Sequence, residues 1–437
     1  MKEREEAFLA LRELSRGSIG SGEGGAKELT PFTRALISGV LRWRPLLDHL
    51  ITKLSGRPLE RIDRDVRELL RIGLYQLFSM DVAPYAAVSE TVEVAARHTG
   101  RAKGFVNAVL RNATRADLKS LVPAGDDPEE EAIRQGHPPW LYERWRRNLG
   151  PARARAVLEA NQELSWPDLL VNTRMTTVDQ ISRVLDQRQL PFVRSPLMPD
   201  MIRLRASTGE VQDEIGRGLV YPMDEGSALV ASLIEGTGRR VLDLAAAPGG
   251  KSLVATLHGH HLVSHDVSLE RLQLLRGSFP RLFGSAPRLV VGDGRNSSFR
   301  ERFDVVLLDA PCSATGIIRR HPEIKWRLTE ERIERYGSLQ RELLLAALDL
   351  TAGECIYSTC SLEPEENDRV VRDVLDQRQD FRLAPFRLSE RTELAPWVER
   401  GILRLTPDSG ADGFTAFRLE RTRASSQESV DNPTSLS

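Results

Sequence analysis

The sequence has few cysteines and no long apolar run. Of its 437 residues only Cys312, Cys355 and Cys360 are cysteine, which is too few for a disulfide framework and suits a reducing compartment. No run of about eighteen apolar residues occurs, so we expect no membrane-spanning helix. The charged first six residues lack the apolar core of a signal peptide. We therefore expect a cytoplasmic protein, and its length predicts two or three domains.

A strong overall charge is also missing. The formal net charge is −1, so composition alone does not indicate a nucleic-acid-binding protein. Residues 1–121, however, contain 20 Lys and Arg against 15 Asp and Glu, a local net charge of about +5. Most of these cations are arginines, whose planar guanidinium groups suit phosphates and base planes. The histidines form no pattern with cysteines or carboxylates, so we expect no metal site.

The first 121 residues show helical periodicity and no strand-like alternation, which predicts an all-α domain. A Gly- and Ser-rich stretch at 17–25 predicts a mobile loop, and an acidic stretch with Pro and Gly at 122–136 predicts a domain boundary. Helices are predicted over residues 5–14, 33–54, 65–80, 87–98 and 105–115.

The rest of the chain mixes strands and helices. Residues 137–215 predict a small α/β domain, with strands over 168–172 and 191–204 around a helix over 178–187. Strand and helix alternate over 216–421, which predicts a doubly wound parallel sheet. Its strands centre near Val241, Val263, Val290, Val306 and Ile356, and residues 403–405 and 415–419 predict a terminal hairpin. The polar residues 422–437 predict a disordered tail.

The segment from Val241 to Ser252 predicts a ligand-binding loop between a strand and a helix. Its small residues let a ligand lie close to the backbone, and the following helix directs free N–H groups at that ligand. A phosphate-binding P-loop of an NTPase would need glycine in place of Ala245, and Pro248 lacks an N–H. A site for S-adenosylmethionine (SAM) needs an acidic residue at the end of the next strand, where Asp266 stands.

Two cysteines follow predicted strands directly. Cys312 follows the strand that ends near Asp309, and Cys360 follows the strand around Ile356. The carboxyl ends of neighbouring parallel strands meet at one edge of a sheet, so we expect both thiols to lie beside the 245–251 loop. Cys355 lies within a strand and is predicted to be a buried packing residue.

A thiol beside a methyl donor indicates covalent catalysis on a pyrimidine. A thiolate that adds to C6 of cytosine makes C5 nucleophilic enough to take a methyl group. Asp309 is placed to contact the ring nitrogen N3, and a cytosine in a stem would have to flip out of the helix. The chemistry of the residues leaves open whether Cys312 or Cys360 attacks.

Three motifs, at 245–251, 309–316 and 358–367, resemble those of the RNA (cytosine-5) methyltransferases. The closest resemblance is to the bacterial 16S rRNA methyltransferases of the Sun/RsmB type, whose features also match residues 318–326 and 412–414. The resemblance runs from about Glu5 to Leu419 and includes a NusB-like RNA-binding domain at the N-terminus. It implies a SAM-dependent enzyme with a Rossmann-like catalytic domain that makes 5-methylcytosine in 16S rRNA, of the position-967 type.

The resemblance also implies residue roles. Cys360 would be the nucleophile, and Cys312 would assist release of the product. The implied cofactor contacts are Ala245, Ala246, Ala247, Pro248, Gly249, Gly250, Lys251, Asp266, Asp293 and Asp309. RNA contacts are predicted at Arg42, Arg44, Arg111, Arg319, Arg320 and Lys325.

Two positions depart from the family pattern. Ala245 stands where cysteine is usual, which is harmless if the loop acts through its backbone, and Met223 stands where glutamine is usual, which removes a contact. We expect a monomer that binds 16S rRNA and neither a metal nor a membrane. The alternatives are a P-loop NTPase and a non-catalytic RNA-binding factor in ribosome assembly.

Overall fold

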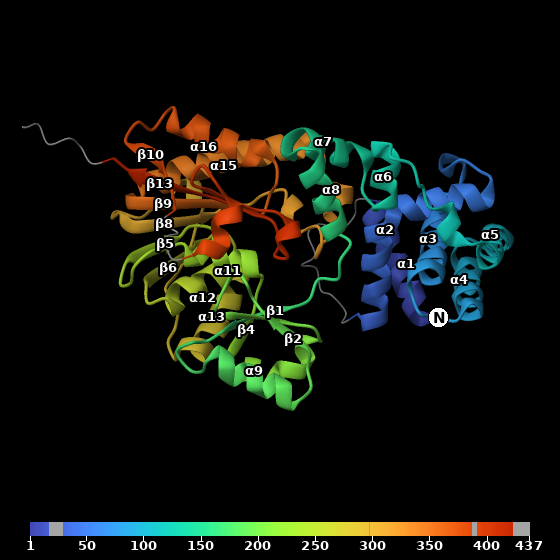
Figure 1. The fold of residues 1–437 in the computed structure, drawn as a ribbon, viewed down its shortest axis with the longest axis horizontal. Coiled ribbons are helices and arrows are strands. Elements are labelled where there is room, and N and C mark those ends of the chain that lie inside the picture. Colours follow the sequence, from blue (N-terminus) through green and yellow to red (C-terminus); the bar gives the residue numbers. More distant parts are fainter. Residues whose placement is uncertain (17–28, 297, 387–390, 423–437) are drawn as a thin grey trace, which may run out of the picture. The chain divides into compact units, whose positions relative to one another are not determined.

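The computed structural model describes residues 1–16, 29–296, 298–386 and 391–422. The chain divides into two compact units, a helical unit of residues 1–165 and 317–328 and an α/β unit of residues 166–316 and 329–437 (Figure 1). The predicted loop at 17–25 and the predicted tail after residue 422 lie outside the described residues.

The N-terminal part of the helical unit contains the five predicted helices, each confirmed within a few residues. Side-chain caps set two of the starts: Thr30 accepts a hydrogen bond from Thr33 N, and Asp63 accepts one from Asp65 N. Apolar faces, including Phe8, Leu47 and Leu70, meet in one core. The helices are α1 (Lys2–Ser15), α2 (Pro31–Ser55), α3 (Arg64–Ser79), α4 (Pro84–His98) and α5 (Lys103–Arg115).

The helical unit extends beyond the predicted boundary at residue 121. It includes α6 (Pro128–Arg134), α7 (Pro139–Leu149), α8 (Pro151–Ala160) and the distant segment Ile317–Leu328, which contains α14 (Ile324–Arg327). Lys325 Nζ donates to the carbonyl oxygens of Arg42 at 2.9 Å and Gly136 at 2.7 Å. Our prediction divided the chain in sequence order, whereas these contacts join segments that are far apart in the sequence.

The first part of the α/β unit is a four-stranded antiparallel sheet in the order β2-β3-β1-β4. Helix α9 (Val178–Gln187) has the predicted bounds because Thr177 and Gln180 form a capping box at its start. Its Ile181 and Leu185 belong to the core beneath the sheet. The strands are β1 (Asp168–Val171), β2 (Phe192–Arg194), β3 (Met201–Leu204) and β4 (Val220–Pro222).

The second part is a nine-stranded sheet in the order β11-β12-β13-β9-β8-β5-β6-β7, with β10 beside β13. Five strands are parallel, at the predicted positions: β5 (Arg240–Asp243), β6 (His261–Asp266), β7 (Leu289–Val291), β8 (Phe303–Asp309) and β9 (Thr351–Thr359). The other four are antiparallel: β10 (Phe381–Ala384), β11 (Val398–Glu399), β12 (Ile402–Leu405) and β13 (Phe414–Arg421).

The predicted parallel strands and the predicted terminal hairpin, β12–β13, are both confirmed, and the hairpin adds antiparallel strands to one side of the parallel sheet. Strand β13 runs antiparallel to β9, with Thr415 opposite Thr359. The short connection over 406–413 joins β12 to β13 without a crossover helix, which suits the antiparallel pairing of these two strands.

Helices pack against this sheet. Leu344 and Leu348 of α15 (Glu330–Asp349) and Val370 of α16 (Asp368–Leu375) share a core with β5, β8 and β9. The remaining α-helices in the described part of the α/β unit are α10 (Gln212–Gly216), α11 (Glu225–Ser232), α12 (Gly250–Leu257) and α13 (Leu269–Phe283). Among the described residues, no helix is both long and apolar enough to cross a membrane.

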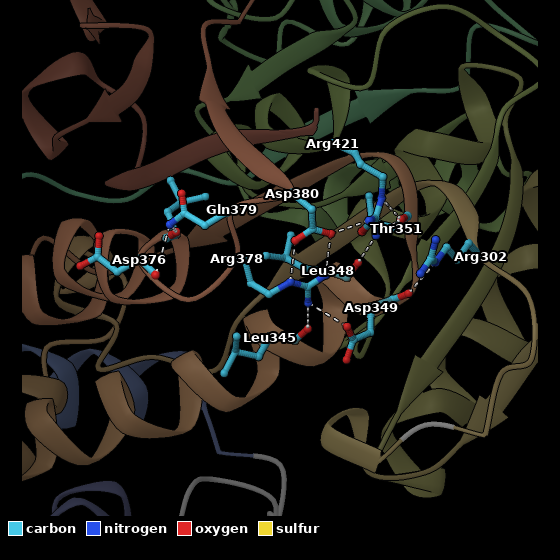
Figure 2. A network of polar contacts seen from close by, with 11 residues as sticks. Arg302, Leu345, Leu348, Asp349, Thr351, Asp376, Arg378, Gln379, Asp380 and Arg421 are labelled. Atoms are coloured by element: carbon cyan, nitrogen blue, oxygen red, sulfur yellow. Dashed lines mark hydrogen bonds and ion pairs between the residues drawn. The ribbon is translucent and has the colours of Figure 1, made fainter. Parts of the chain in front are cut away.

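A polar network joins the start of β9 to the ends of its neighbours (Figure 2). Arg378 donates to Asp380 at 2.9 Å and to Asp349 at 2.8 Å, and Arg421 donates to Asp380 and to the carbonyl oxygen of Thr351. The hydrogen bond from Arg378 lowers the pKa of Asp380 to about 2. The network therefore ties the start of β9 to the end of β13 and the end of α15, at the end of β9 that is opposite to Cys360.

Candidate functional site

The loop between β5 and α12 lies at the carboxyl end of the parallel strands. Ala247 N donates to Asp266 Oδ2 at 3.0 Å, and Ser268 N donates to Asp266 Oδ1 at 2.9 Å, so this carboxylate ties the loop to the end of β6. Gly249 has a φ of +112°, and a Cβ there would lie 2.0 Å from Leu275. The backbone conformation and the packing of Leu275 therefore require glycine at 249, independently of any ligand that approaches it.

A cavity of about 250 Å³ opens beside this loop. Met223 forms part of its wall, and a Cβ on Gly250 would lie 3.0 Å from the Met223 methyl carbon. An apolar side chain therefore covers the place where related proteins are expected to have glutamine. The lining residues are Tyr221, Pro222, Met223, Asp224, Ser227, Asp243, Ala245, Ala246, Ala247, Pro248, Gly249, Gly250, Lys251 and Asp309.

Asp243 is a residue of this cavity that our sequence analysis did not select. Its side chain is fully buried, Ser252 Oγ donates to Oδ2 at 2.7 Å, and Oδ1 has no hydrogen-bond partner. Burial raises the pKa of Asp243 to about 7. An unpaired buried acceptor is costly unless a ligand supplies a donor. In the sequence, Asp243 could have been selected because it ends a predicted strand directly before a loop of small residues.

The predicted cofactor residues Asp266 and Asp293 lie along the same edge of the sheet. Gly292 N donates to the carbonyl oxygen of Asp266 at 3.0 Å, which places the two turns side by side. Arg295 hydrogen-bonds to Asp293 and lowers its pKa to about 2. Val267, next to Asp266, is 72% exposed and offers an apolar surface at this edge. Small loop residues, an unpaired acceptor and this edge together fit a cofactor with donor and apolar groups, such as SAM.

The predicted meeting of two cysteines is confirmed. Cys312 Sγ and Cys360 Sγ lie 3.0 Å apart, and both residues are free thiols that are partly exposed. The hydrogen bond with Cys360 and then burial raise the pKa of Cys312 well above its usual value. Cys355 is 0% exposed within β9, as predicted for a packing residue.

Asp309 connects the cavity to the cysteines. It ends β8, lines the cavity and stands three residues before Cys312. Its carboxylate accepts hydrogen bonds from Lys251 Nζ at 2.7 Å and Ser358 Oγ at 2.8 Å. Burial lowers the pKa of Lys251, but the charge and hydrogen bond of Asp309, together with the nearby Cys360 and Asp243, outweigh burial, so the pKa is raised. The charged amine of Lys251 therefore lies at the cavity and pairs with the carboxylate of Asp309, which is partly exposed to solvent.

The RNA contacts predicted from sequence need correction. Lys325 and Arg319 are only 2% and 4% exposed, so the prediction that they bind RNA is wrong. Arg42 donates to the carbonyl oxygens of Glu163 and Arg319, each at 2.8 Å, and Arg44 pairs with Glu68 at 3.1 Å. Arg42, Arg44 and Lys325 therefore make their contacts within the helical unit, and Arg319 is buried in it. Arg320 is half-buried in the same segment.

Arg111 differs from these four because it is exposed on α5. Arg115 and Lys103 are exposed on the same helix, and Arg57 lies over the ring of Phe105 at 4.8 Å. No acidic residue occurs between positions 97 and 115. This basic surface of α5 can meet phosphates without competition from carboxylates on its own helix.

Three family models match the chain. The 16S rRNA methyltransferase RsmB/F model matches residues 231–420, the NusB family model matches 1–115, and the ferredoxin-like domain of RsmF/B-like methyltransferases matches 137–211. Two relatives are both named ribosomal RNA small subunit methyltransferase B. The one from Sodalis glossinidius is 36% identical over 407 residues, covering 89% of each chain, and the one from Pseudomonas putida is 35% identical, covering 90% of this chain and 91% of that one.

Solved structures show the same architecture. The crystal structure of PH0851 has a TM-score of 0.76 at 24% identity and covers 96% of this chain and 97% of that one. A methyltransferase homolog protein from Pyrococcus horikoshii has a TM-score of 0.57 at 27% identity and covers 68% of this chain and all of that one. The fold is thus shared along almost the whole chain.

Proposed function

Because the chain belongs to the RsmB family of SAM-dependent rRNA methyltransferases, we propose that it methylates C5 of one cytosine in 16S rRNA, of the position-967 type, through a covalent bond between Cys360 Sγ and ring carbon C6. The observation that supports this most strongly is the pair of free thiols 3.0 Å apart beside Asp309 and the cavity. Two adjacent thiols suit a reaction in which one sulfur bonds to the base and must later leave it.

The reaction begins at Cys360. Its thiolate adds to C6, and the electrons of the C5–C6 bond shift so that C5 becomes nucleophilic. Charge develops at N3 during this addition. In this proposal the Asp309 side chain contacts N3, and the hydrogen bonds from Lys251 and Ser358 hold that side chain in place. SAM, when bound, supplies the electrophilic methyl group that C5 takes.

Release of the product follows. The C5 proton leaves to a base, the C6–sulfur bond breaks, and Cys360 departs as a thiolate while the C5–C6 double bond forms again. The raised pKa of Cys312 keeps its sulfur protonated at neutral pH. A neutral thiol next to the leaving sulfur can donate a hydrogen bond to the thiolate, which supports the assignment of Cys312 to release.

The cofactor would be held by residues from three turns. The small residues 245–250 allow close approach to the backbone, and Asp243 offers the unpaired acceptor Oδ1. Asp266 and Asp293 stand at the ends of the next two strands, where acidic side chains can hold hydroxyl and amino groups. The P-loop alternative has lost its support, because the family is established and Pro248 cannot donate an N–H.

For the RNA we propose the basic surface of α5 as a phosphate contact. Phosphate contacts give affinity and orientation without reading sequence, so the choice of cytosine would come from the site in the α/β unit. A base in a stem would have to leave its stack to reach the two cysteines.

The test is methylation in vitro. Purified protein, SAM and unmodified 16S rRNA should yield 5-methylcytosine at a single position, mapped by bisulfite sequencing and confirmed by nucleoside mass spectrometry. Methylation at another ring atom, or SAM-independent RNA binding without methyl transfer, would contradict the proposal. The second result would favour the RNA-binding assembly factor.

A further inference from the structure

Glu366 is a buried carboxylate behind the two cysteines. It ends the short 3-10 helix Pro364–Glu366 and is 0% exposed. Its Oε2 accepts hydrogen bonds from Ser313 N at 2.8 Å and Gln340 Nε2 at 3.0 Å, and its Oε1 accepts one from Ser361 Oγ at 2.7 Å. These contacts join three segments of the α/β unit at one side chain.

The contacts of Glu366 fall on the neighbours of the cysteines. Ser313 follows Cys312 and Ser361 follows Cys360 in the chain, and the two serine hydroxyls are 3.1 Å apart. Gln340 of α15 also donates to the carbonyl oxygen of Pro311 at 2.8 Å. Glu366 therefore holds Ser313 directly and Pro311 through Gln340, and these two residues flank Cys312 in the chain.

This carboxylate differs from an ordinary buried ion pair. Glu354, buried near the other end of β9, pairs with two cations, Arg239 and Arg418. The three donors to Glu366 are an amide N–H, a hydroxyl and a side-chain amide, all neutral. Burial raises the pKa of Glu366, because burying its charged form costs folding free energy. None of these donors is a cation that would offset that cost. An apolar side chain of similar size would give the fold equal or greater stability, so stability alone does not account for a glutamate at this position.

We propose that Glu366 is a positioning residue that holds the Cys312 and Cys360 loops at a single spacing, so that the releasing thiol stands beside the attacking one. The role in methylation rests on the proposed function, whereas the spacing itself does not. A misplacement of about 1 Å at a reacting centre costs roughly 100-fold in rate.

Two substitutions separate positioning from charge. In E366Q the amide oxygen can accept from Ser313 N and Gln340, and the amide nitrogen can donate to Ser361 Oγ, which is able to accept. E366A removes all three contacts. The glutamine variant should therefore keep the spacing and the alanine variant should lose it.

The spacing can be measured without RNA. The full-length protein is treated with diamide, which takes two electrons from the two thiols and receives their two protons as the Cys312–Cys360 disulfide forms. The closure rate, followed by mass spectrometry, is divided by the iodoacetamide alkylation rate of the same thiols to remove differences in thiol reactivity. SAM affinity and the methylation rate are measured on untreated portions of the same protein preparations.

We expect E366A to lower both the normalised closure rate and the methylation rate roughly 100-fold, with unchanged SAM affinity, and E366Q to restore most of both. E354Q, the matched control, should lower the melting temperature and leave closure unchanged. A wild-type closure rate in E366A would overturn the proposal. If E366A does not fold, S361A, which removes the bond from the Cys360 loop to Glu366 together with the contacts of this hydroxyl with Ser313, Thr315 and Glu363 N, must lower the closure rate, and an unchanged rate overturns the proposal. Normal closure in a wild-type protein that methylates no cytosine would refute the proposed function alone.

Discussion

Cys312 Sγ lies 3.0 Å from Cys360 Sγ, although the two residues are 48 positions apart in the chain. The parallel strands β8 and β9 produce this proximity, because Asp309 pairs with Ser358 at their carboxyl ends and each cysteine follows within three residues. A single base that reaches one sulfur also reaches the other. The order in which the sulfurs act is then open to experiment.

Asp243→Asn should weaken SAM binding. The substitution removes a charged acceptor beside the cavity, and a hydrogen bond to a charged group contributes about 1.5–3 kcal/mol, or roughly 10- to 100-fold in affinity. Because the pKa of Asp243 is about 7, the difference should be full at pH 8 and shrink at pH 6, where the wild-type carboxyl is protonated. Calorimetric titration at both values measures it.

The control for this experiment is Asp304→Asn. Asp304 accepts from Arg240 N at 2.9 Å at the start of β8, at the opposite end of that strand from Asp309. Its substitution should leave SAM affinity unchanged. Equal affinities of wild type and Asp243→Asn at pH 8 would remove Asp243 from the cofactor site.

Arg111→Ala and Arg115→Ala should weaken RNA binding through its dependence on salt. Each arginine on α5 that meets a phosphate should add about 1 to the slope of log affinity against log salt concentration. Filter binding over a salt series measures the slope, and SAM affinity should not change. Arg382→Ala, at an exposed arginine that pairs with Glu420, is the control. An unaltered slope in the double variant would assign the α5 surface to another role.

Lys325→Ala should destabilise the helical unit. The carbonyl oxygens of Arg42 and Gly136 would lose a buried donor, which costs about 2–4 kcal/mol in the free energy of unfolding. Urea unfolding followed by circular dichroism of the helices measures this loss. The exposed Lys119→Ala should change stability by about 0.5 kcal/mol or less. Weaker RNA binding without loss of stability in Lys325→Ala would restore it as an RNA contact.

Asp380→Asn should lower stability at neutral pH and lose its effect in acid. Arg378 holds the folded-state pKa of Asp380 at about 2, below the ordinary 3.8, so the carboxylate stabilises the fold above about pH 4 and less as pH falls toward 2. The melting temperatures of variant and wild type should converge as the pH falls from 4 to 2. Asp349→Asn removes the more exposed partner of Arg378 and should have a smaller effect. A gap that does not depend on pH would contradict this origin of the stabilisation.

Local patterns predicted most elements and the meeting of the cysteines. Helical periodicity marked the first five helices, and the strand-end rule brought Cys312 and Cys360 together, because both signals are contained in short stretches. The burial of Lys325 could not be predicted in this way. A lysine in an arginine-rich stretch predicts an exposed cation, and only the packing of α2 and residue 136 supplies the carbonyl oxygens that accept from it.

Two other outcomes required three-dimensional information. Gly249 is fixed by its positive φ and by Leu275, which lies 26 positions further along the chain. Asp243 resembles any acidic residue at a strand end until its unpaired oxygen is seen beside the cavity. Contacts between distant segments decide both cases, and a single sequence carries no direct record of them.

The most direct test of the account is the covalent intermediate in cysteine variants. Each variant is incubated with 16S rRNA and SAM and run on a denaturing gel. Cys312→Ala should accumulate a slowly migrating RNA–protein band that contains methylated RNA, because attack and methyl transfer occur and release fails. Cys360→Ala and the double variant should show no band, since release cannot matter before attack. A band in Cys360→Ala and none in Cys312→Ala would reverse the two roles, and no band in any variant would contradict covalent catalysis by this pair.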